Sequence, residues 1–196
     1  DAEGYDLLGL MTGSEGLLGV ITEVTVKIIK CPEVAKAALI GFPSIEDAGK
    51  CVTEIIAKGI IPAGMEIMDK ALTKATNDFS KAGYPMDAEA MMIVELDGTE
   101  SEVSELIKRV EEIAKENKCS SVKRSKSDEE RLKFWTGRKA AFPACAELAP
   151  DYMCMDGSIP RGKLAEVLKE IQKLSVKYNL PVANAFHAGD GNLHPL

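Results

Sequence analysis

Hydrophobic residues recur along this chain with two different periodicities. One periodicity predicts strands and the other predicts helices. Between residues 20 and 29, Val24, Val26 and Ile28 alternate with polar residues, as in a strand with one buried face. Short apolar runs predict further strands at residues 34–42, 63–68, 91–96, 121–124, 152–159 and 182–187. Glycine and proline separate most of these runs, which is typical of turns.

Apolar residues spaced three or four apart predict amphipathic helices between the strands. Ser44, Thr99 and Ser127 are placed to cap three of these helices, and a glutamate follows the last two at the spacing of a capping box. The helices are predicted to begin near residues 44, 69, 99, 127 and 160. Pro143 limits the fourth helix, because proline breaks the backbone hydrogen bonds of a helix interior.

Alternating strands and helices are compatible with a doubly wound parallel sheet, but the predicted strands do not favour it. They carry polar residues and lack the continuous apolar runs of strands that are buried on both faces. The pattern therefore predicts an α+β fold, with one sheet and the helices packed on one face.

Composition narrows the possible partners of the molecule. The 196 residues carry a formal net charge of -7 and no basic cluster, which argues against a nucleic-acid surface. No apolar run approaches the roughly 20 residues of a membrane span. The 5 cysteines lack a C-x-x-C spacing, so neither disulfides nor an iron–sulfur site is indicated, and a reducing cytoplasm suits them. The chain begins at Asp1 without methionine, so we expect it to be a piece of a longer protein.

Glycines recur at Gly13, Gly16 and Gly19 in the stretch GLMTGSEGLLGVIT. A loop of this kind leaves backbone N–H groups uncovered and can approach a phosphate closely. Its spacing matches neither a Walker loop nor a dinucleotide fingerprint, and a loop that only requires positive φ angles explains it equally well.

Two further stretches contain residue types that bind ligands. In RLKFWTGRKAAF, Trp135 and Arg138 share a helical face, and an arginine beside aromatic rings is suited to a carboxylate, although most helical arginines are solvated. NAFHAGDGNLHPL contains both histidines of the chain, His187 and His194, on either side of a turn. Two imidazoles facing each other can hold a divalent metal with a third ligand. Asp190 is a candidate for that ligand, or it braces the turn.

Over essentially its whole length the chain resembles the FAD-linked 2-hydroxyacid dehydrogenases and oxidases, the family that includes the glycolate oxidases. The resemblance rests on four segments in this order: GYDLLGLMTGSEGLLGVITEVTVKI, FWTGRKAAFPA, PDYMCMDGSIPR and VANAFHAGDGNLHPL. It implies that residues 1–33 are the end of an FAD-binding domain and that residues 34–196 are most of a ferredoxin-like cap domain with a mostly antiparallel sheet. The residues expected near FAD are Ser14, Gly16, Gly19 and Ile21.

The resemblance also implies roles for the candidate site. His187 and His194 match ligands of zinc or a similar divalent ion, with an acidic third ligand and a proton-accepting histidine expected beyond Leu196. Arg138 matches the residue that binds the substrate carboxylate. Relatives that oxidise hydroxydiacids carry threonine and lysine where this chain has Phe142 and Cys154, which favours a small monoacid.

The activity implied by the resemblance is oxidation of glycolate or D-lactate to the 2-keto acid. The hydride passes from the substrate to the flavin, and the electrons pass to an iron–sulfur or cytochrome subunit, through which the protein can associate with the inner face of a membrane. This chain is then an incomplete and inactive part of the enzyme. The alternative is a free-standing α+β module that binds a small molecule or a partner subunit without catalysis.

Overall fold

The computed structural model describes residues 3–196, which divide into two compact units, one ending at Cys31 and the other covering Pro32–Leu196. In the first unit, Asp6 caps the short helix α1 (Leu7–Met11), because its side chain accepts a hydrogen bond from the Gly9 N–H. Residues 20–29 form no strand, contrary to the prediction. Their alternating side chains are exposed, and none of the described strands pairs with them, so the backbone lacks the partner that a strand requires.

The second unit contains all the strands that the structure describes. Its helices are α2 (Ile45–Ala57), α3 (Lys70–Ser80), α4 (Glu100–Glu116), α5 (Asp128–Lys139), α6 (Ala141–Ala144) and α7 (Leu164–Tyr178), with short 3-10 turns at Cys145–Glu147 and Arg161–Lys163. Its strands are β1 (Val34–Phe42), β2 (Gly64–Asp69), β3 (Ala90–Gly98), β4 (Ser121–Arg124), β5 (Gly157–Ser158), β6 (Asn184–His187) and β7 (Asn192–Pro195). None of the helices among residues 3–196 is long and apolar enough to cross a bilayer.

The strands form one sheet in the order β4-β1-β3-β2-β6-β7-β5, and every neighbouring pair is antiparallel. The predicted α+β class with a mostly antiparallel sheet is therefore confirmed. The strand predicted at residues 152–159 is reduced to Gly157–Ser158, and β7 was not predicted.

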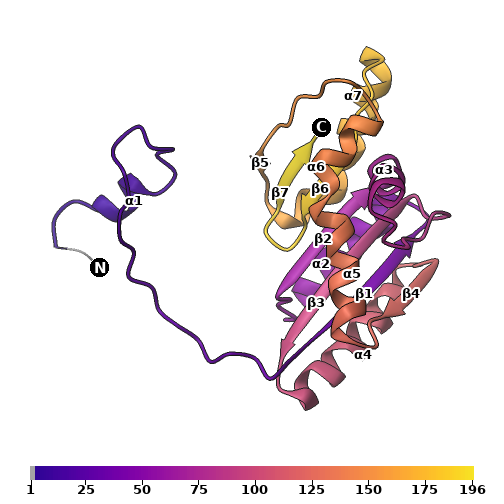
Figure 1. Ribbon diagram of the computed structural model, residues 1–196, viewed down its shortest axis with the longest axis horizontal. Coiled ribbons are helices and arrows are strands. Elements are labelled where there is room, and N and C mark those ends of the chain that lie inside the picture. The colour runs from indigo at the N-terminus through magenta and orange to yellow at the C-terminus, as the bar shows by residue number, and fades with distance from the viewer. Residues whose placement is uncertain (1–2) are drawn as a thin grey trace. The chain divides into compact units, whose positions relative to one another are not determined.

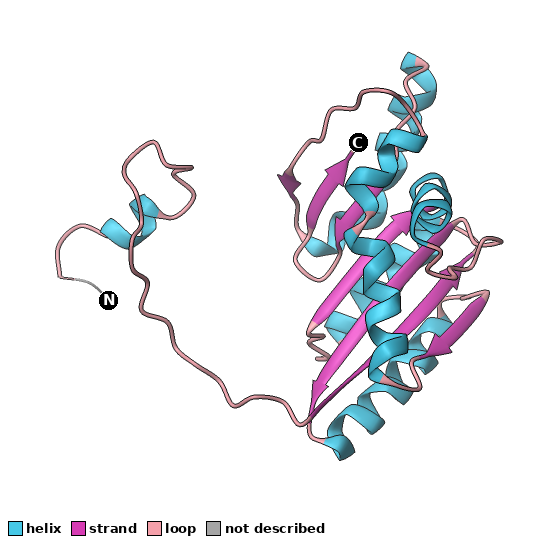
Figure 2. Cartoon of the chain, in the orientation of Figure 1, coloured by secondary structure: helices cyan, strands magenta, loops and turns pink. Residues whose placement is uncertain are grey.

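Helices cover both faces of the sheet, which corrects the prediction of helices on one face only. In β1, Ala38 and Ile40 pack into a cluster with α2, α4 and α7, whereas Ala37 and Leu39 pack into a second cluster with residues of α3, α5 and α6. Figures 1 and 2 show α3 and α5 in front of the strands and α2 and α4 behind them. Because the strand is apolar on both sides, each face requires its own cover.

Candidate active site

Strand register places Glu66 directly opposite His187. The two residues are paired across β2 and β6, and the Glu66 Oε1 atom lies 2.7 Å from the His187 Nδ1 atom. Directly opposite side chains of an antiparallel pair lie on the same face, within reach of each other. This is the face that α3, α5 and α6 cover, because the next residues of β2 and β6 on that side, Met68 and Ala185, belong to the second cluster.

A tight hairpin between β6 and β7 brings His194 beside His187. The backbone N–H groups of Asp190 and Gly191 both donate to the His187 carbonyl, and Gly191 has a φ of 77°. A side chain at Gly191 would also meet the Ile159 carbonyl oxygen, 2.3 Å from the position of an added Cβ. The imidazole rings of His187 and His194 consequently stand edge to face with their centroids 5.1 Å apart.

Arg138 reaches the same carboxylate from the helix that crosses this face. Its Nε donates to Glu66 Oε2 over 3.1 Å, and its Nη2 lies 3.0 Å from that oxygen. Both side chains are buried, with 8% of Arg138 and 10% of Glu66 exposed. Glu66 therefore uses one oxygen for His187 and the other for Arg138, which links all three residues.

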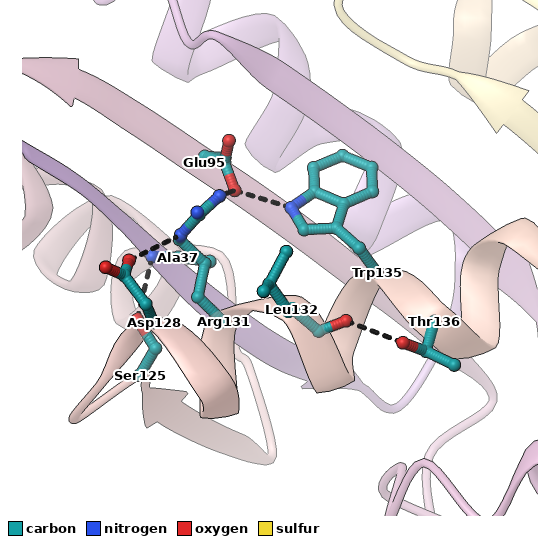
Figure 3. Close-up of polar contacts among 8 residues, drawn as sticks. All are labelled: Ala37, Glu95, Ser125, Asp128, Arg131, Leu132, Trp135 and Thr136. Carbon is teal, nitrogen blue, oxygen red and sulfur yellow. Dashed lines mark hydrogen bonds and ion pairs between the residues drawn. The ribbon is translucent and has the colours of Figure 1, made fainter. Parts of the chain in front are cut away.

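A second glutamate anchors the helix that carries Arg138. Glu95 on β3 accepts hydrogen bonds from the Trp135 Nε1 at 2.5 Å and from the Arg131 Nη1 at 3.0 Å, as Figure 3 shows. Gly64 lies against the Trp135 ring, because an added Cβ would come within 2.9 Å of it. These contacts fix α5 against β2 and β3, one helical turn before Arg138.

Two nitrogen atoms at this place are buried without a hydrogen-bond partner within the described part of the chain. They are Nη2 of Arg138, whose approach to Glu66 lacks the alignment of a hydrogen bond, and Nδ1 of His194. Buried polar atoms usually have a hydrogen-bond partner, so these two nitrogen atoms are candidates for contact with a ligand. The Phe142 ring lies edge-on to His194 at 5.9 Å between centroids and forms an apolar border of the site.

The structure brings together the three residues that the sequence singled out, but it does not group three metal ligands. Among residues 3–196, no set of three or more His, Cys, Asp or Glu side chains is placed to hold a metal ion. Asp190 is exposed, and its backbone rather than its side chain closes the turn. Cys154 is also exposed, and its thiol donates to the Met155 carbonyl.

Sequence reasoning missed Glu66, although the sequence contains a signal for it. Glu66 interrupts the apolar run of β2, and a charged residue in a buried strand requires a partner. What the sequence could not provide was the identity of that partner, because His187 is 121 positions away and Arg138 is 72.

The predicted FAD loop lies in the first unit. Gly13 and Gly16 have φ angles of 77° and 80°, and an added Cβ would meet nothing within 4 Å at either. Gly19 has a φ of 158° and Ile21 is exposed. Ser14 closes the turn by accepting from the Leu17 N–H, and it lines a hollow of about 320 Å³. The backbone of this loop is thus open to a ligand.

Comparison with protein families identifies the chain. Residues 31–196 match the family model of the FAD linked oxidases, C-terminal domain. The chain belongs to this family. The FAD-linked oxidase domain therefore fills the second unit, from its first residues to the β6-β7 hairpin.

Curated relatives of the FAD-linked oxidase domain include glycolate oxidase subunits and a D-lactate dehydrogenase. The resemblance that the sequence motifs indicated is therefore confirmed. The glycolate oxidase subunit GlcD of Escherichia coli (strain K12) is 54% identical over 196 residues, covering 100% of this chain and 39% of that protein. GlcD of Bacillus subtilis (strain 168) is 37% identical, covering 100% and 42%. The mitochondrial D-lactate dehydrogenase (cytochrome) of Arabidopsis thaliana is 33% identical, covering 98% and 34%. The chain thus spans well under half the length of these relatives.

Solved structures support the fold of the FAD-linked oxidase domain. Alkyldihydroxyacetonephosphate synthase matches with a TM-score of 0.66 at 17% identity, covering 98% of this chain and 42% of that one. p-Cresol methylhydroxylase matches with a TM-score of 0.59 at 11% identity, covering 84% and 39%. At such low identities the likeness concerns the fold alone.

Proposed function

We propose that this chain is the substrate-binding part of an FAD-dependent oxidoreductase that oxidises a small 2-hydroxy acid, glycolate or D-lactate, to the 2-keto acid. The observation that carries the proposal is the convergence of Arg138, His187 and His194, with buried nitrogen atoms left unpartnered at the same place. The names of the relatives, glycolate oxidase subunit and D-lactate dehydrogenase, support the substrate class.

Arg138 binds the carboxylate of the substrate in this proposal. Its Nε donates to Glu66, and its Nη2, which lies 3.0 Å from the same oxygen, is buried without a hydrogen bond and can donate to an incoming carboxylate. A guanidinium held in place by one carboxylate loses little further freedom when it binds a second one. Charge-assisted hydrogen bonds in a buried site are among the stronger ones in proteins.

His187 and His194 hold a divalent metal, for which zinc is our candidate. Two adjacent imidazoles, one with a buried and unpartnered nitrogen, fit part of such a site. We propose that the third ligand lies outside the described residues, which supply no set of three. A bound metal would act as a Lewis acid on the substrate hydroxyl.

The glycine-rich loop of the first unit contacts FAD in this proposal, through Ser14, Gly16, Gly19 and Ile21. The positive φ angles of Gly13 and Gly16, together with the open space around both, support a close approach of the loop to a cofactor. FAD bound there would supply the acceptor for the hydride of the substrate. Residues of this chain bind and orient the substrate for that step.

Phe142 favours a monoacid over a diacid. Its ring borders His194, so this side of the site offers an apolar surface where a second carboxylate would need a donor. Cys154 is a free thiol, which carries no positive charge, so it does not provide a cation for a second carboxylate. Glycolate and D-lactate each carry a single carboxylate and are compatible with this border.

We propose that an iron–sulfur or cytochrome subunit would accept the electrons of a bound flavin. The printed names of the relatives support this step, because one is called a subunit and another a cytochrome-linked dehydrogenase. The 5 cysteines of this chain are free and dispersed over its described residues, so they do not form an electron carrier themselves.

The test of the proposed function is Arg138→Ala in the whole flavoprotein that contains this chain. Loss of a charged hydrogen-bonding partner should raise KM for glycolate or D-lactate about 30-fold to about 150-fold, equivalent to about 2–3 kcal/mol. Steady-state kinetics with an artificial electron acceptor measure this change. Lys139→Ala is the matched control, because Lys139 is the next residue of α5 and is exposed. Equal KM values for the wild type and Arg138→Ala would remove Arg138 from the site.

A further inference from the structure

We propose that Glu66 is the positioning residue of this site, because it fixes the proton of neutral His187 on Nδ1 and leaves Nε2 free as the ligand nitrogen. The inference rests on the metal role of His187 in the proposed function. Its own content is the position of one proton, which can be measured without a metal or a substrate.

The hydrogen bonds at Glu66 have a fixed direction. Oε2 accepts from the Nε of Arg138, and Oε1 lies 2.7 Å from the Nδ1 of His187. A carboxylate that is paired with a guanidinium is an acceptor at both oxygens. His187 must therefore donate from Nδ1, since the other tautomer would place two lone pairs against each other at that distance.

The burial of Glu66 strengthens the preference of His187 for the tautomer with its proton on Nδ1. The Glu66 side chain is 10% exposed, whereas 44% of the His187 side chain is exposed. The Nδ1 edge of the ring thus meets a buried acceptor, and another part of the ring stays accessible. Hydrogen bonds are electrostatically stronger in a buried environment than in water, and the backbone register that places Glu66 opposite His187 restricts movement of either residue.

A neutral replacement of Glu66 cannot serve both partners in the same way. In Glu66→Gln the side chain has one acceptor oxygen and one donor amide. The guanidinium of Arg138 offers only donors, so the oxygen should turn to Arg138 and the amide nitrogen to His187. His187 would then have to present a lone pair at Nδ1, and its proton would move to Nε2, where it opposes metal binding.

The experiment measures the tautomer of His187 by long-range ¹H–¹⁵N NMR on the 196-residue chain labelled with ¹⁵N-histidine. His187 and His194 are its only histidines, so a His187→Gln variant assigns both rings. At about pH 8.5, where free histidine is neutral, we expect the Nδ1–H form in the wild type and the Nε2–H form in Glu66→Gln. The double variant Glu66→Gln/Arg138→Met should return to Nδ1–H, because the amide oxygen is then free to accept from His187.

If Glu66 had a purely structural role, the Nδ1–H form of His187 would not be lost in Glu66→Gln and restored in the double variant. The wild-type spectrum alone tests the proposal if a variant fails to fold, since an Nε2–H form of His187 in the wild type would overturn it. A Glu66→Gln chain that folds and keeps Nδ1–H would overturn it as well. Backbone amide spectra report folding in each variant.

Titration of the whole flavoprotein, which can supply the third ligand, with zinc chloride then separates this inference from the proposed function. Glu66→Gln should weaken zinc binding about 10-fold to about 100-fold, the usual effect of removing a carboxylate behind a ligating histidine, and the double variant should recover most of it. A shifted tautomer with unchanged zinc affinity would support the role of Glu66 in placing the proton and would overturn His187 as a metal ligand.

Discussion

At the scale of single residues, Asp69 shows how a partly buried carboxylate joins two elements of the fold. Its Oδ1 accepts from the Leu72 N–H at 3.0 Å and caps α3, and its Oδ2 accepts from the Asn184 side chain at 2.8 Å. Burial nevertheless raises the pKa of Asp69 above its ordinary value, because desolvation of the charged form outweighs these hydrogen bonds. The folded protein therefore binds this proton more tightly than the unfolded chain does.

The raised pKa of Asp69 predicts a pH-dependent effect of Asp69→Asn. The contribution of Asp69 to stability is fully present in acid and is lost as pH rises through its folded-state pKa. Asparagine also caps helices, and the unpartnered Oδ1 of Asn184 can accept from it after rotation of that amide. The free energy of unfolding of Asp69→Asn should thus increase relative to the wild type between acid and neutral pH.

Urea denaturation of both proteins over this pH range measures the difference for Asp69→Asn. All other carboxylates are common to the two proteins, so their titration cancels in the difference to first order. A difference that stayed constant or declined with rising pH would contradict the assignment of burial as the dominant effect on Asp69.

At the scale of elements, the packing of α5 against Tyr84 depends on Gly137. The Tyr84 hydroxyl donates to the Phe134 carbonyl at 2.5 Å, and an added Cβ at Gly137 would lie 2.1 Å from that hydroxyl oxygen. Burial raises the pKa of Tyr84, so the hydroxyl stays protonated and remains a donor. Tyr84 is thus held at α5 by a bond that leaves no room for a side chain beside Arg138.

Gly137→Ala should therefore destabilise the protein by about 1–3 kcal/mol, the usual cost of overpacking. This direction opposes helix propensity, which favours alanine over glycine by about 1 kcal/mol. Urea denaturation measures the change, and Gly162→Ala is the matched control, because an added Cβ at Gly162 meets nothing within 4 Å. An alanine at position 137 that was neutral or stabilising would show that α5 can move away from Tyr84 at little cost.

The elements that sequence could predict are those determined by local chemistry. Ser44, Thr99 and Ser127 each cap the predicted helix, because a cap needs only the next three residues. By contrast, β7 is short and contains Pro195, and it forms only where β5 and β6 can pair with it. The alternation of apolar and polar residues at 20–29 likewise indicates which side of a strand would be buried, but it does not specify a partner strand.

In the candidate site, too, some residues could be predicted from the sequence and one could not. Arg138, His187 and His194 could be singled out from short motifs with unusual residue types, and the fold places them together. Glu66 could not be connected with them, because the connection is made by the register of β2 against β6 and by the position of α5. Register depends on tertiary pairing, which no short motif specifies.

At the scale of the whole molecule, we infer that one face of the sheet mainly stabilises the fold and that the other carries the candidate site. Both clusters consist of apolar residues, but the buried ion pair of Glu66 and Arg138 lies on the face that α3, α5 and α6 cover. A buried ion pair contributes little net stability, because desolvation offsets much of the attraction. The face that α2, α4 and α7 cover is thus the one that mainly stabilises the fold, and the face with the ion pair can accommodate a polar site.

Both clusters consist of residues between 34 and 196, which predicts that residues 32–196 fold without the rest. None of residues 3–31 is buried, so their removal should change the free energy of unfolding by no more than about 0.5 kcal/mol. Urea denaturation of the shortened and the complete chain measures this, and the slope of the transition should also be retained.

A chain that starts at residue 44 is the matched control for this shortened chain. It lacks β1, which lies between β4 and β3 and contributes to both clusters, so it should lose the cooperative transition. If residues 32–196 also unfolded without cooperativity, the core would depend on the preceding segment. The geometry of the site on β2, β6 and α5 would then depend on the preceding segment as well as on the sheet.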